Sequence, residues 1–182
     1  MGKIILCRGK KADTLLTVLQ TGVKLYTAEE LCYYIYNNIY LIGQDFIDDN
    51  LISFLDETGE KELAERVRKL KETGGSLAQI FVIILKTIDY YSVEEIEQLK
   101  GILNTLGKQS VCERLKARGD GYLNAGYYFA AVRCYESIIK DYKGKDLLAA
   151  DYAKVYHNLG TAYALSLIHI SEPTSVEESR MP

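Results

Sequence analysis

Two strings in the C-terminal half of the chain decide how this part of it folds. They are Gly-Tyr-Tyr-Phe-Ala-Ala-Val-Arg-Cys-Tyr-Glu (residues 126–136) and Tyr-His-Asn-Leu-Gly-Thr-Ala-Tyr (residues 156–163). The second string follows the helix-pair repeat pattern W-x2-L-G-x2-Y, with tyrosine in the tryptophan position. The first contains the companion pattern A-x3-F as Ala131 and Tyr135. Small residues at these places let two helices cross closely, and the aromatic residues fill the space beside the crossing, so the strings predict paired helices.

On these residues, the region 111–164 resembles a tetratricopeptide repeat. The first helix of the repeat is expected over residues 111–125 and the second over residues 127–142, and a further copy begins near Ala153. The resemblance implies a set of helix-packing positions, namely Gly119, Tyr122, Ala131, Tyr135, Tyr156, Leu159, Gly160 and Tyr163. The chain departs from the family at Arg118, where leucine is usual. Gly119 and Gly160 are also 41 residues apart, against the standard repeat of about 34.

The second copy is not completed. The position of its close-packing alanine falls on Glu172, and Pro173, a helix breaker, follows directly. The run Leu-Ser-Leu-Ile-His-Ile-Ser-Glu-Pro-Thr (165–174) resembles the translation of a sequencing adapter read into an open frame. We therefore expect residues 165–182 to be a non-native tail, with the natural chain truncated inside its second repeat, and we assign no role to His169.

The region before the repeat is predicted to be helical. Four capping boxes precede apolar periodic runs, and each marks a helix start: Thr27/Glu30, Ser76/Gln79, Ser92/Glu95 and Ser110/Glu113. The helices are expected over 27–41, 45–57, 60–73, 77–91 and 93–106. Because short connections join most of them, neighbouring helices should run antiparallel. The predicted fold class is all-α, with stacked antiparallel helical hairpins in the manner of an α-solenoid.

The first residues differ from this pattern. Lys3–Cys7 and Val23–Tyr26 are short extended runs and are candidates for a small β-ribbon. The predicted organisation is an extended segment over 1–26, a helical domain over 27–109, tetratricopeptide-like repeats over 110–164 and the tail over 165–182.

Composition excludes several classes of function. The net charge is −3 and the isoelectric point is about 5.5, which disfavours nucleic acid as a partner. No apolar run approaches the roughly 18 residues of a membrane span, and the N-terminal run Ile4–Cys7 is too short for a signal peptide. We expect a cytoplasmic protein without membrane association.

The four cysteines form no CxxC pair and only two histidines are present, so no metal site is expected.

The sequence favours a non-enzymatic scaffold that binds a protein or peptide in the groove of the stacked helices. In family members that hold a terminal carboxylate, lysine and asparagine side chains of the first helices clamp it, and the corresponding groove residues here are Lys116, Lys154 and Asn158. Asp120 replaces an expected asparagine and would repel such a ligand.

The sequence offers less support for two other functions. An enzyme would need a nucleophile–base pair or a phosphate loop, and the sequence shows neither. No cofactor is expected. The alternative is a regulator whose residues 27–107 bind nucleic acid and whose repeats sense a ligand.

Overall fold

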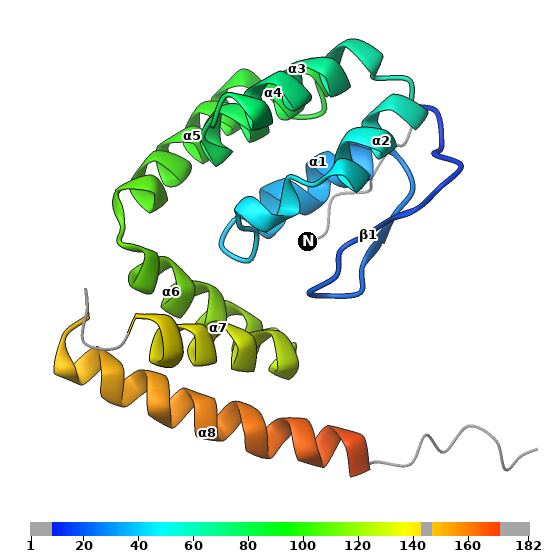
Figure 1. The fold of residues 1–182 in the computed structure, drawn as a ribbon. Helices are drawn as coiled ribbons and strands as arrows, with labels where there is room; N and C mark the ends of the chain where they lie inside the picture. The colour runs from blue at the N-terminus through cyan, green and yellow to red at the C-terminus, as the bar shows by residue number, and fades with distance from the viewer. Residues whose placement is uncertain (1–8, 143–146, 172–182) are drawn as a thin grey trace, which may run out of the picture. The chain divides into compact units, whose positions relative to one another are not determined.

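The computed structural model describes residues 9–142 and 147–171, with side chains up to Ile168. Helices make up most of the described chain, accompanied by one two-stranded ribbon (Figure 1). The predicted all-α class is therefore confirmed. The chain divides into two compact units, Met1–Gln109 and Ser110–Pro182.

A short ribbon precedes the helices of the first unit. Strand β1 (Leu16–Thr17) pairs antiparallel with β2 (Lys24–Leu25), with Leu16 opposite Leu25. Lys24 and Leu25 of the expected run Val23–Tyr26 thus pair with β1, and the other expected run, Lys3–Cys7, lies outside the described residues. The local pairing needs only a tight turn, in which the Gly22 amide donates to the Val18 carbonyl over 2.7 Å. Leu16 and Leu25 are buried in the same core as the helices, so the ribbon is part of this unit.

All four predicted capping boxes are present. They begin α1 (Ala28–Asn37), α4 (Leu77–Ile88), α5 (Val93–Lys108) and α6 (Val111–Asn124). In each case the hydroxyl of the cap accepts from the third helical amide, and the Glu or Gln at that position accepts from the cap amide. These bonds satisfy amides that have no partner within the helix.

Helix α1 is shorter than the predicted 27–41. The side-chain amides of Asn37 and Asn38 donate to the carbonyls of Tyr33 and Tyr34, which closes the last turn. Residues 38–48 then form a connection that contains a single 3₁₀ turn, η1 (Gln44–Phe46). The apolar spacing beyond Asn37 reflects burial of this connection and does not reflect more helix.

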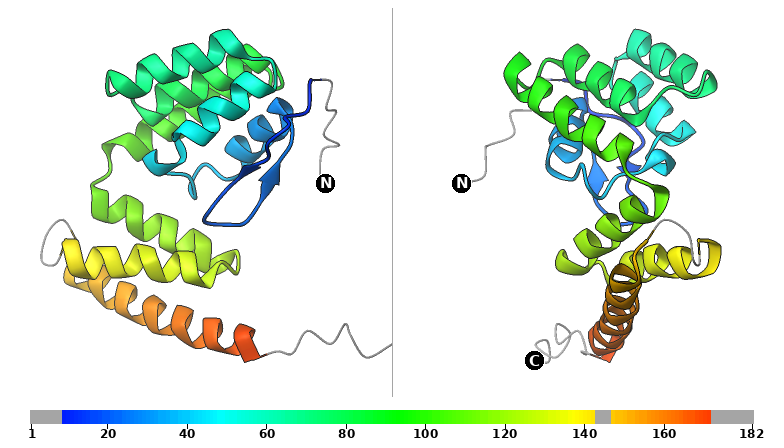
Figure 2. Two further views of the ribbon diagram at one scale, coloured as in Figure 1. Left: turned by 45° about the vertical axis from the view of Figure 1, so that its right-hand side comes forward. Right: turned by 90° about the vertical axis from the view of Figure 1, so that its left-hand side faces the viewer.

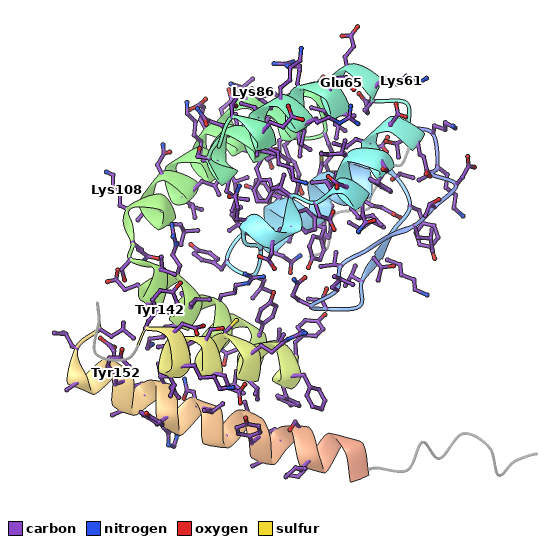
Figure 3. The ribbon with its side chains drawn as sticks, in the orientation of Figure 1. Lys61, Glu65, Lys86, Lys108, Tyr142 and Tyr152 are labelled. Carbon is purple, nitrogen blue, oxygen red and sulfur yellow. The ribbon has the colours of Figure 1, made fainter. Side chains whose placement is uncertain are left out.

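In the first unit, α2 (Asp49–Glu57), α3 (Lys61–Glu72), α4 and α5 form two hairpins, and α4 is the central helix of the unit. Helix α2 packs against α3, and α4 packs against α5. Helix α4 also contacts α1 and α3, as expected for a helix that is apolar on most of its surface. Helix α3 exposes a charged face to solvent, which includes Lys61 and Glu65 (Figure 3).

The second unit consists of α6, α7 (Tyr128–Asp141) and α8 (Ala149–Ser171). Gly126 closes the turn between α6 and α7 with φ +81°, a conformation that glycine adopts without strain. Helix α7 packs along both α6 and α8 (Figures 1 and 2), and α6 also contacts α8. The Tyr152 hydroxyl donates to the Tyr142 carbonyl over 2.6 Å and holds the start of α8 beside the end of α7 (Figure 3).

Helix α8 exceeds its predicted limits at both ends. It begins before Ala153 and continues to Ser171, beyond the expected boundary at residue 164. Residues 161–171 contain no glycine or proline, so no local signal ends the helix there.

Candidate interaction surface

The packing of α6 on α7 depends on Gly119. A Cβ atom placed on Gly119 would lie 2.7 Å from Cε1 of Tyr135, closer than real Cβ contacts allow. Tyr135 is fully buried, and Ala131, one turn before it, is also fully buried. The structure therefore brings Gly119 and Tyr135 together where α6 packs on α7. Tyr122 is buried one turn further along α6 and makes an edge-on ring contact with Tyr127.

Asp120 lies beside this crossing and joins all three helices of the unit. Its Oδ1 accepts from the Tyr135 hydroxyl of α7 over 2.7 Å and from Nδ2 of Asn158 of α8 over 2.9 Å. Its Oδ2 accepts from Nζ of Lys116, one turn earlier on α6, over 2.9 Å. One carboxylate thus satisfies donors from α6, α7 and α8.

These contacts change the acidity of both partners. Partial burial acts to raise the pKa of Asp120, but the hydrogen bonds from Lys116, Tyr135 and Asn158 outweigh it, so the pKa lies below its ordinary value. Burial, followed by the hydrogen bond to Asp120, raises the pKa of the Tyr135 hydroxyl. Asp120 is therefore ionised and Tyr135 is a neutral donor near pH 7.

The predicted groove residues are placed differently from one another. Lys116 and Asn158 both bind Asp120, whereas Lys154 lies 3.8 Å from Asp151 and keeps 66% of its side chain exposed. The chain's own Asp120 thus engages two of the three residues predicted to hold a terminal carboxylate. The expectation that Asp120 repels such a ligand stays a prediction, and the structure shows that Lys116 and Asn158 are engaged within the chain.

The second copy of the packing positions has a different environment. Leu159 is half-buried, but Tyr156 and Tyr163 are 52% and 43% exposed. A Cβ atom on Gly160 would have no described atom within 4 Å outside its own helix and neighbours. The opposite face of α8 is the packed one, with Val155 and Ala162 fully buried.

Of the two exposed tyrosines, Tyr163 makes a hydrogen bond to α7. The Tyr163 hydroxyl donates to Glu136 of α7 over 2.5 Å, and Lys140 donates to the same carboxylate over 3.0 Å. Tyr163 therefore leans toward α7 and leaves the centre of the face at Gly160 uncovered.

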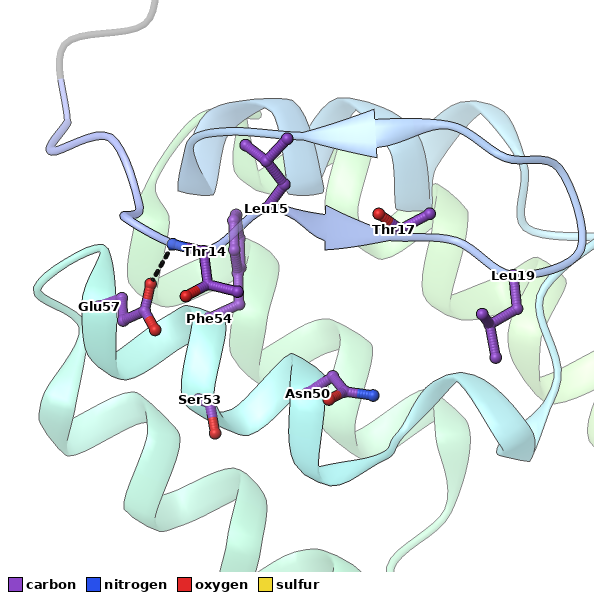
Figure 4. Close-up of a pocket in the computed structure, with 8 residues that line it drawn as sticks. All are labelled: Thr14, Leu15, Thr17, Leu19, Asn50, Ser53, Phe54 and Glu57. Atoms are coloured by element: carbon purple, nitrogen blue, oxygen red, sulfur yellow. Dashed lines mark hydrogen bonds between the residues drawn. The ribbon is translucent and has the colours of Figure 1, made fainter.

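The first unit has a shallow pocket of about 260 Å³ between β1 and α2 (Figure 4). Phe54 of α2 is a buried part of its lining, and the Thr14 amide donates to Oε2 of Glu57 over 2.7 Å (Figure 4). The pocket is lined by Thr14, Leu15, Thr17, Leu19, Asn50, Ser53, Phe54 and Glu57.

Within residues 9–142 and 147–171, no three side chains of histidine, cysteine, aspartate or glutamate gather as metal ligands would. Over the same ranges, no helix combines the length and the hydrophobicity of a membrane span.

In comparisons with known proteins, no family model, no curated protein and no solved structure matches this chain.

Sequence reasoning assigned Asp120 only a repulsive effect and did not identify it as a shared acceptor. The spacing of Lys116 and Asp120 by four residues is a signal for the first contact, because such residues are neighbours on a helix. The contact of Asp120 with Asn158 spans 38 residues and has no comparable signal in the sequence.

Proposed function

We propose that this chain is a non-enzymatic interaction module that binds a peptide or protein segment along α6 and α8. The observation that supports it is the hydrogen bond between Asp120 of α6 and Asn158 of α8, which joins the two helices that carry the predicted groove residues. A surface made of two linked helices suits an extended segment better than a small substrate. The resemblance to tetratricopeptide repeats favours the same function.

The chemistry of this surface narrows the ligand. Lys116 and Asn158 are engaged by Asp120, so they offer no ready pair of donors to a free carboxylate. Lys154 keeps most of its side chain in water and is a cation of α8 that a ligand can reach. We therefore propose a segment with an acidic side chain opposite Lys154, and not one held by its C-terminal carboxylate.

A displayed peptide library selected on the purified protein tests this function. Selected peptides should bind the wild type and bind Lys154→Glu at least about tenfold more weakly, since charge reversal opposes an acidic segment. Lys61→Glu makes the same charge change on an exposed position of α3 and should leave binding unchanged. A selection that enriches no peptide, or peptides that bind both variants alike, would contradict the proposal.

A further inference from the structure

Strand β1 has one edge that is not used by the ribbon. The Val18 amide donates to the Val23 carbonyl over 2.8 Å, so these two residues form a hydrogen-bonded pair. Hydrogen-bonded and non-hydrogen-bonded pairs alternate along an antiparallel ladder, which makes Thr17 and Lys24 a non-hydrogen-bonded pair. The amide and carbonyl of Thr17 therefore point away from β2, and among the described residues no backbone group pairs with them.

The pocket between β1 and α2 lies beside this edge (Figure 4). Its volume of about 260 Å³ is below the roughly 300–1,000 Å³ of small-molecule sites, so it suits side chains of a longer chain better than a whole ligand. Within its lining, Glu57 accepts the Thr14 amide, as the carbonyl of a neighbouring strand would. A backbone amide close to β1 thus already binds an acceptor from outside the ribbon.

The side chains at this edge determine the charge of a partner. Leu16 and Leu25 are buried, so the next pair, Thr17 and Lys24, occupies the solvent face of the ribbon, and both residues are exposed. Lys24 has no ion-pair partner among the described residues. A residue of an added strand opposite Thr17 would stand about 10 Å from Lys24, two strand spacings away. Because Thr17 is short, a glutamate at that place can extend across it to the Lys24 ammonium group.

From the edge, the pocket and the cation we infer that β1 is a docking site for an extended segment of another protein, added as an antiparallel strand with a glutamate opposite Thr17 and an apolar residue beside the glutamate. The glutamate exchanges both backbone hydrogen bonds with Thr17 and pairs with Lys24. Its apolar neighbour points to the opposite face, on which Val18 is buried in the same core as Phe54 of the pocket lining. The site consists of residues of the first unit and is independent of the surface proposed on α6 and α8.

The charges around β1 favour this partner over a second copy of the chain. Two β1 strands paired at Thr17 would bring no carboxylate beside Lys24, because the row across the sheet would contain only two threonines between two lysines. Glu57, the carboxylate of the pocket lining, is held at Thr14, three residues or about 10 Å along the chain from Thr17. The acidic residue of the partner is therefore expected at Thr17 and not at Thr14.

The probe is the peptide acetyl-Ser-Thr-Val-Glu-Val-Thr-Ser-amide, which has a central glutamate between two valines. It is titrated into the isotope-labelled full chain, and the amide signals are followed by NMR, which detects weak binding at each residue. We expect saturable shifts of the Leu15, Thr17 and Leu19 amides. Methylation of the glutamate nitrogen removes the donor to the Thr17 carbonyl and should weaken binding at least about tenfold.

An exchange of charges tests the contact with Lys24. Lys24→Glu should bind the glutamate peptide at least about threefold more weakly, and it should prefer the same peptide with lysine in place of the glutamate. Lys61→Glu makes the same charge change on an exposed position of α3 and should bind both peptides as the wild type does.

A proline at the edge tests the backbone contact from the side of the protein. The Thr17 amide points away from β2, so Thr17→Pro removes a donor from the edge and leaves the hydrogen bonds of the ribbon in place. It should weaken binding at least about tenfold, whereas Thr17→Val should bind as the wild type does. Unchanged amide signals of Val23 and Leu25 would verify that the ribbon is intact in both variants.

The inference fails if the peptide gives no saturable shifts at β1, if methylation leaves the affinity unchanged, or if Lys24→Glu does not reverse the charge preference. A wild-type dimer that Thr17→Pro dissociates would also overturn it, since a second copy would then be the occupant. Library peptides that lose binding to Lys154→Glu and bind Thr17→Pro normally would support the surface on α6 and α8 only, so the two proposals can fail separately.

Discussion

The ring of Tyr135 rests on the backbone of Gly119, with Cε1 only 2.7 Å from where a Cβ atom would stand. Gly160, which stands three residues before Tyr163 as Gly119 stands three residues before Tyr122, faces open space. Two glycines in the same local pattern thus have opposite environments. The difference comes from their neighbours, because α7 covers the first glycine and no described segment covers the second.

The first prediction compares alanine at the two glycines. Gly119→Ala should lower the free energy of unfolding by about 1–3 kcal/mol, because the added methyl group forces Tyr135 or a backbone to move. Gly160→Ala should raise it by about 0.5–1 kcal/mol, because alanine favours the helix and meets no neighbour. Urea unfolding followed by circular dichroism measures both values, and equal effects of the two changes would contradict the packing described.

The second prediction concerns the acidity of Asp120. Its pKa is lowered in the folded chain, so its contribution to stability is present above the unfolded value, near 3.8, and is lost as the pH falls through the folded value. The difference in unfolding free energy between the wild type and Asp120→Asn should therefore shrink when the pH is lowered from 7 to below the folded pKa. Urea unfolding at several pH values measures this difference.

A control for this experiment is Asp56→Asn, which removes one carboxylate from an exposed position of α2. A constant difference between the wild type and Asp120→Asn across the pH range would show that Asp120 does not stabilise the unit through its charge.

The third prediction tests the start of α6. The Ser110 hydroxyl accepts from the Glu113 amide over 3.2 Å, so Ser110→Ala should cost about 0.5–2 kcal/mol in unfolding free energy. Ser110→Asp keeps an acceptor at this position and should be close to the wild type. Thermal unfolding of the three proteins provides the comparison, and equal midpoints for the alanine and aspartate variants would exclude a stabilising cap.

The fourth prediction concerns Cys32, which is fully buried on α1. Burial, with a smaller effect from the charges of Glu29 and Glu60, raises the pKa of its thiol and leaves almost no thiolate near pH 8. N-ethylmaleimide should modify Cys32 slowly in the folded chain and quickly in urea, as measured by mass spectrometry of the peptide. Modification at the same rate in both conditions would contradict the burial of this side chain.

Local signals in the sequence predicted much of the helical structure. The hydroxyl and carboxylate or amide of each capping box lie three residues apart, so Thr27, Ser76, Ser92 and Ser110 could be identified as helix starts without knowledge of the fold. Helix ends were less predictable. The end of α1 depends on the amides of Asn37 and Asn38, and the apolar residues beyond them are buried as part of a loop.

The amino-acid sequence alone determined the helical class and the four capped starts, because these depend on residues a few places apart. The tertiary structure decided which glycine is covered, since that depends on whether a second helix lies against it. It also decided that Asp120 binds Lys116, Tyr135 and Asn158, which requires α6, α7 and α8 to meet at one carboxylate. Contacts across such distances in the chain arise from packing, and the spacing of residues does not encode them directly.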